Sequence, residues 1–174
     1  MFDPEGPVLG IDPGLSTCGY GAVRRTGHDL TAVACGVVRT LPDAPLPERL
    51  ATLEADLDAF VRELRPAALA VERILFQANV RTAISVGQAS GLALAVAARA
   101  GVPVTHYSPN EVKLAVAGDG AAVKVQVQEM TRRLLNLASA PPPDAADALA
   151  LAVCHLWRAP LRDGVARAVA RSRS

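Results

Sequence analysis

The stretch Val8-Leu9-Gly10-Ile11-Asp12-Pro13-Gly14, near the start of the chain, decides the fold. Its first four residues form a continuous apolar run, which is typical of a buried strand. Asp12-Pro13-Gly14 is a turn signal, because proline presets the backbone for a turn and glycine tolerates conformations that other residues avoid. The stretch therefore predicts a buried strand that ends on a carboxylate.

Further strands and helices follow this first strand. The segments Tyr20–Arg25 and Leu30–Thr40 flank a Thr26-Gly27-His28-Asp29 turn and predict a hairpin. A second apolar run, Ala67–Val71, ends on Glu72. The remaining predicted elements are helices over Leu50–Leu64, Val80–Ala100, Asn110–Ala117, Ala122–Asn136 and Asp144–Arg158, and a strand over Val102–Tyr107. This order predicts an α/β fold, with a mixed five-stranded sheet flanked by helices on both faces.

The composition indicates one globular domain. The chain has 174 residues, of which 51% are apolar and 20% charged, and this balance favours a packed core over disorder. Residues 158–174 carry a net charge of +4, against −3 for residues 1–157. We therefore expect a single domain over 1–157 and a basic, flexible tail over 158–174, which either attracts polyanions or only aids solubility.

Several classes of protein are disfavoured by what the sequence lacks. Three Phe, two Tyr and one Trp are too few for a single-strand binder built on stacked bases. The longest wholly apolar run, Leu92–Ala98, is far shorter than the roughly 18 residues of a membrane span, and the acidic N-terminus is unlike a signal peptide. The three cysteines form no C-x-x-C pair, which argues against a zinc site. We expect a cytoplasmic protein.

Four carboxylates end or begin apolar runs, where a charge must be desolvated. Asp12 and Glu72 each follow a predicted strand, and Asp144 and Asp147 precede an apolar helical run. Residues three apart share a helix face, so both aspartates can point toward the ends of the two strands. Four converging carboxylates need cations to remain ionised, and Mg²⁺ suits such a site. Two ions about 4 Å apart would clamp the oxygens of a phosphodiester during in-line displacement.

Each of these acids also has a purely structural interpretation. The two aspartates of the helix have the spacing of an N-cap and the third helical residue, and follow three prolines. Asp12 can stabilise the turn before Pro-Gly through its own side chain. Glu72 can pair with Arg73 or Arg81. Each interpretation explains one position, whereas a metal site explains all four.

The chain resembles the RuvC-type Holliday junction resolvases, in the ribonuclease H-like superfamily. The resemblance rests on Leu9-Gly10-Ile11-Asp12-Pro13-Gly14, Gly19-Tyr20-Gly21, Ala70-Val71-Glu72 and Asp144-Ala145-Ala146-Asp147-Ala148-Leu149, in this order. It implies a ribonuclease H-like fold and a homodimer that resolves four-way DNA junctions in recombination and repair. The implied reaction is paired, symmetric nicking with Mg²⁺ or Mn²⁺, two ions per site, and the family also implies contact with a branch-migration motor.

The resemblance assigns roles to individual residues. Asp12, Glu72, Asp144 and Asp147 fall on the family's four acidic metal ligands, with Asp12 bridging both ions. Lys113 and Lys124, the only lysines in the chain, match basic positions near the DNA, and Lys124 is expected beside the acids in catalysis.

A polar segment after the second strand is expected to contact DNA. Phe76 is either the aromatic residue that wedges into the junction centre or a residue that covers the core. Gln77, Asn79 and Arg81 are expected to contact bases or phosphates.

Small residues recur every four positions along the predicted Val80–Ala100 helix. Ala83, Gly87, Gly91 and Ala95 form a smooth stripe that lets another helix approach closely. The stripe packs either on the chain's own sheet or on a second copy. A dimer suits a junction of approximate two-fold symmetry, because it supplies two matched sites.

Three other functions compete with junction resolution. The Ile-Asp-Pro-Gly turn also resembles the phosphate-binding turn of actin-like and sugar-kinase-type phosphotransferases, which need a second such domain that the chain lacks. Another ribonuclease H-like nuclease, YqgF-type or RNA-directed, would share the fold with a different substrate. A junction-binding module without catalysis would bind DNA and leave it uncut.

Overall fold

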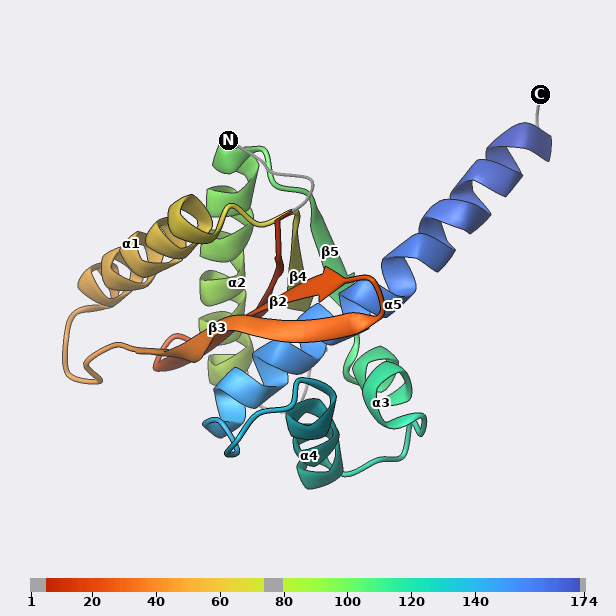
Figure 1. The fold of residues 1–174 in the computed structure, drawn as a ribbon. Coiled ribbons are helices and arrows are strands. Elements are labelled where there is room, and N and C mark those ends of the chain that lie inside the picture. The colour runs from red at the N-terminus through yellow and green to blue at the C-terminus, as the bar shows by residue number, and fades with distance from the viewer. Residues whose placement is uncertain (1–5, 74–79, 173–174) are drawn as a thin grey trace.

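The computed structural model describes residues 6–73 and 80–172, and it confirms the predicted five-stranded sheet with helices (Figure 1). The strands are β1 (Val8–Asp12), β2 (Thr17–Thr26), β3 (Asp29–Arg39), β4 (Ala68–Glu72) and β5 (Val104–Tyr107). The helices are α1 (Leu46–Leu64), α2 (Val80–Ala100), α3 (Pro109–Ala117), α4 (Lys124–Leu134) and α5 (Pro143–Ser172).

The sheet is mixed, with the strand order β3-β2-β1-β4-β5. β2 pairs antiparallel with both β1 and β3, so the predicted hairpin forms. β4 pairs parallel with β1 and with β5. β1 therefore lies at the centre of the sheet, and its carboxyl end lies beside the carboxyl end of β4.

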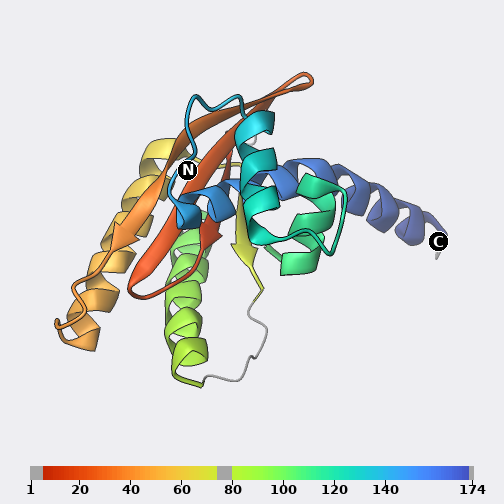
Figure 2. The ribbon, with the colours of Figure 1, turned by 90° about the horizontal axis from the view of Figure 1, so that it is seen from below.

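Each face of the sheet has its own hydrophobic core. On one face, α1 and α2 pack on β1 and β4 through a cluster that includes Leu53, Leu57 and Val96. On the other face, α3, α4 and α5 share a cluster that includes Leu149 and Val153. Figures 1 and 2 show the two helical layers on opposite sides of the sheet.

Strand alternation turns two of the predicted acids toward α5. Leu9 and Ile11 of β1, and Val71 of β4, all belong to the core under α1 and α2. Successive side chains of a strand point to opposite faces. Asp12 and Glu72, each one residue further on, therefore point to the face that α5 covers.

Glycines on this face let α5 contact the sheet directly. A Cβ on Gly10 would overlap the carbonyl oxygen of Ala148, and a Cβ on Gly19 would overlap the carbonyl oxygen of Asp144. Gly19 pairs directly with Asp12 across β1 and β2. The absence of side chains at these two positions therefore seats the first turn of α5 over the end of β1.

One helix is longer than the sequence predicts. α1 contains the predicted apolar positions from Leu50 to Leu64 and begins at Leu46, between Pro45 and Pro47, where the missing N–H of a proline has no helical partner to lose. α5 continues to Ser172 rather than ending at Arg158, and it passes through Pro160. The alanines and arginines after this proline are strong helix formers, which supports continuation.

Most of the predicted tail is therefore helical backbone rather than an irregular chain. In Figures 1 and 2 the last turns of α5 project away from the sheet. The division into a domain over 1–157 and a basic tail over 158–174 remains a prediction.

We expect Gly10→Ala to lower the free energy of unfolding by about 2–3 kcal/mol, because the new methyl group must push α5 off the sheet. Urea unfolding measures the change. Ala51→Gly, at an exposed position in the interior of α1, is the control, and it should lower the free energy of unfolding by no more than about 1 kcal/mol. Equal stabilities of Gly10→Ala and wild type would contradict the packing described.

Candidate metal centre

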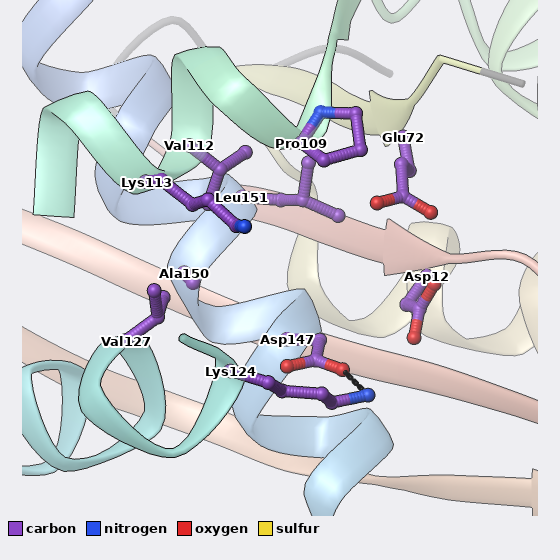
Figure 3. Close-up of a pocket in the computed structure, with 10 residues that line it drawn as sticks. All are labelled: Asp12, Glu72, Pro109, Val112, Lys113, Lys124, Val127, Asp147, Ala150 and Leu151. Carbon is purple, nitrogen blue, oxygen red and sulfur yellow. Dashed lines mark ion pairs between the residues drawn. The ribbon is translucent and has the colours of Figure 1, made fainter. Parts of the chain in front are cut away.

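A pocket of about 210 Å³ opens at the carboxyl ends of β1 and β4 (Figure 3). Two strands and three helices contribute to it, which is why it forms only in the complete fold. Its lining residues are Asp12, Glu72, Pro109, Val112, Lys113, Lys124, Val127, Asp147, Ala150 and Leu151. The carboxylates of Asp12, Glu72 and Asp147 thus lie in one pocket with two lysines, and apolar residues line the rest of it.

Three of the four predicted acids come together beside this pocket. One carboxylate oxygen from each of Asp12, Asp144 and Asp147 lies within 4.8 Å of the other two. Asp12 comes from the end of β1, and the two aspartates come from the first turn and a half of α5. The contact between α5 and the glycines of the sheet brings these two elements together.

Glu72 lies outside this set of three but lines the same pocket. In Figure 3 its carboxylate faces the space above Asp12. Burial and the nearby Asp147 raise the pKa of Glu72, although Lys124 opposes them. The fourth acid is therefore part of the same electrostatic site.

The carboxylates disfavour one another's ionisation. Burial, Glu72, Asp147 and Asp144 together raise the pKa of Asp12 to about 7, against the opposing effect of Lys124. A carboxyl group with this pKa is only partly ionised at neutral pH. A bound cation would remove the conflict, and clustered carboxylate oxygens are the ligands that Mg²⁺ and Mn²⁺ prefer. The residues therefore fit a hard divalent cation.

The structural interpretations of these acids find no support in the contacts. Among the described contacts, neither Asp144 nor Asp147 accepts a hydrogen bond from the backbone of α5. Among the same contacts, Glu72 forms no ion pair with Arg73 or Arg81. Helix capping and surface pairing therefore do not explain why the acids converge.

Two residues of α4 fix the carboxylate of Asp147. The ammonium nitrogen of Lys124 lies 2.5 Å from its Oδ2, and the amide nitrogen of Gln128 donates to its Oδ1 at 3.2 Å. The hydrogen bond to Asp147 raises the pKa of Lys124, which keeps the ammonium charged. Gln128 was not among the predicted site residues, although its position four residues after Lys124 places both on one helix face.

The remaining predicted site residues are less close to the acids. Lys113 lines the pocket from α3. Arg81 is exposed near the start of α2. Phe76, Gln77 and Asn79 lie outside the described residues.

The family model and the most similar curated proteins that were found indicate the same family. The family model for crossover junction endodeoxyribonuclease RuvC matches residues 8–155. The chain is 53% identical over 168 residues to the crossover junction endodeoxyribonuclease RuvC of Salinispora arenicola, covering 95% of this chain and 96% of that protein. It is 50% identical over 169 residues to that of Streptomyces griseus, covering 96% and 83%.

A solved structure agrees with these sequences. The structure of Thermus thermophilus RuvC in complex with a Holliday junction substrate superposes with a TM-score of 0.85 at 40% identity, covering 90% of this chain and 96% of that one. Both the sequence and the fold are thus shared over nearly the whole length. The chain belongs to the RuvC family of crossover junction endodeoxyribonucleases.

Proposed function

We propose that this chain is a metal-dependent endonuclease that resolves four-way DNA junctions by paired, symmetric nicks in recombination and repair. The observation that carries the proposal is the acidic pocket, built by α5 on the sheet of a RuvC-family chain. The Thermus thermophilus relative was solved with a Holliday junction. A shared family and fold, together with the acidic cluster of this chain, support the same substrate class here.

The four acids are the proposed metal ligands. Asp12, Asp144 and Asp147 would hold one ion, and Asp12 together with Glu72 would hold a second. Bound Mg²⁺ or Mn²⁺ would activate water and offset the charge that develops on the phosphoryl oxygens. Asp12 is partly buried, lines the pocket and forms no ion pair among the described residues, so its carboxylate is available to a cation.

The lysines supply positive charge on the α3 and α4 side of the acids. Lys124 holds Asp147 and is placed to neutralise a phosphate that reaches the pocket. Lys113 lines the pocket without a carboxylate partner among the described residues, so its charge is available to the DNA backbone. Arg81, and the undescribed Phe76, Gln77 and Asn79, are proposed DNA contacts from the family resemblance alone.

The outward face of α2 supports a homodimer. Val80 and Ile84 are 71% and 56% exposed, and a Cβ on Gly87 or Gly91 would meet no atom within 4 Å. The small-residue stripe therefore does not pack on the chain's own sheet. Two copies that share this face would carry two sites, which matches the approximate two-fold symmetry of a junction.

By length and composition, α2 could span a membrane. Its most apolar 18 residues have a mean hydropathy of 1.3, and 28% of them are buried in the fold. Ala93, Val96 and Ala97 on its inner face pack into the core of the sheet. We propose a soluble, cytoplasmic enzyme, and contact with a branch-migration motor remains an expectation from the family.

We expect the wild-type chain to nick a synthetic four-way junction in two symmetric strands with Mg²⁺ or Mn²⁺, and to leave it intact in EDTA. Asp147→Asn should bind the junction and lose at least about a hundredfold in nicking rate, since it loses a charged ligand. Linear duplex and an RNA–DNA hybrid are the control substrates. Preferential cutting of either control would overturn the junction claim.

Mixed subunits extend the same experiment to the dimer. An equimolar mixture of wild type and Asp147→Asn, exchanged before assay, should give many junctions with one nick, because each mixed dimer has one active site. A product distribution that contains only doubly nicked and uncut junctions would contradict two independent sites in one particle. Binding without any cleavage by wild type would favour a non-catalytic junction-binding module.

We expect Asp12→Asn to stabilise the metal-free protein at pH 8 by roughly 1–3 kcal/mol. The pKa of this carboxyl rises from 3.8 to about 7 on folding, so its ionisation weakens the fold as pH rises through this range. The gain should be smaller at pH 5 and level off above about pH 7. Urea unfolding in EDTA measures it, and a variant less stable than wild type at pH 8 would contradict the repulsion inferred.

A further inference from the structure

Strand register places Arg39, which the sequence analysis did not single out, on the same face of the sheet as the acids. Asp12 pairs with Gly19 and Gly19 pairs with Val37, while Arg39, two residues further along β3, pairs with Thr17. Paired residues, and residues two apart in a strand, share a face. The side chain of Arg39 is exposed there, beyond the carboxyl end of β1.

This arginine lies across the acids from Lys113. In the order β3-β2-β1-β4-β5, Asp12 and Glu72 occupy the central strands, Arg39 lies on the edge strand β3, and Lys113 belongs to the helix that follows the opposite edge strand. Two strand spacings and two residues separate the Cα atoms of Arg39 and Asp12 by about 12 Å. At a rise of about 3.4 Å per nucleotide, this distance covers roughly two to four nucleotides of one strand.

Near the same end of β3, Arg49 of α1, the helix on the other face of the sheet, is held in place by neutral groups. Arg49 donates from Nε to the Thr40 hydroxyl at 2.9 Å and from a terminal nitrogen to the Ser16 hydroxyl at 2.8 Å. Among the described residues, no carboxylate forms an ion pair with Arg39 or Arg49. Within the described residues, their positive charge is therefore not neutralised.

We propose that Arg39 binds a backbone phosphate of the DNA strand on the β3 side of the cleaved bond. The strand would then pass from Lys113, over the acids, to Arg39. This assignment rests on the proposed nuclease function and adds a second anchoring point for its substrate. Phosphate contacts of this kind fix the register of DNA without reading its sequence.

The test is junction binding by Arg39→Gln in Ca²⁺ or EDTA, where no cleavage interferes. We expect about three- to tenfold weaker affinity and a log–log salt slope smaller by about one, because one phosphate contact is lost. Arg39→Lys should retain the slope, since it keeps the charge. Thermal unfolding of each variant checks that the exposed substitution leaves the fold intact.

Arg24→Gln is the matched control, an exposed arginine on β2 near the turn that joins it to β3. It should leave both affinity and slope unchanged. If wild type binds and cuts junctions but Arg39→Gln behaves like Arg24→Gln, the inference is wrong and the proposed function stands. If wild type neither binds nor cuts DNA, both are wrong.

Discussion

The contact of α5 with bare backbone on the central strands is the constraint on which the site depends. Gly10, Gly19 and Gly21 have no side chains, and a Cβ on any of them would overlap atoms of α5. The helix axis therefore lies close to the sheet, and the first turns of α5 reach the end of β1. Without that approach Asp144 and Asp147 would be surface acids at a helix start, and Asp12 would be an ordinary turn residue.

The close packing of α5 on the sheet also brings the acids together, which lowers the stability of the folded protein until a cation binds. Burial and three neighbouring acids raise the pKa of Asp12 to about 7, while Lys124 and Gln128 hold Asp147 by its two oxygens. Such conflicts are common at functional sites, because the arrangement serves the reaction rather than stability. Lys124 partly offsets the conflict in the free protein and remains beside the place where a phosphate would lie.

The sequence predicted what depends on local pattern. Apolar runs ending on Asp12 and Glu72 identified the two central strands, and helical spacing identified α5 with its aspartates. It could not distinguish capping from convergence, because that requires knowing that α5 lies on Gly19. Gln128 and Arg39 were missed for the same reason: their roles follow from packing and strand register, which a single sequence does not contain. The helix expected over Asp144–Arg158 continues to Ser172, because the residues after Arg158 are mostly good helix formers despite Pro160.

The central claim is that folding assembles these acids into a cation site. Diffraction from crystals soaked in Mn²⁺, recorded at the manganese absorption edge, tests it directly. We predict one anomalous peak among the carboxylate oxygens of Asp12, Asp144 and Asp147, and a second between Asp12 and Glu72 when a DNA phosphate completes the site. Absence of any peak in this pocket at saturating Mn²⁺, with or without bound DNA, would show that the acids do not form a cation site.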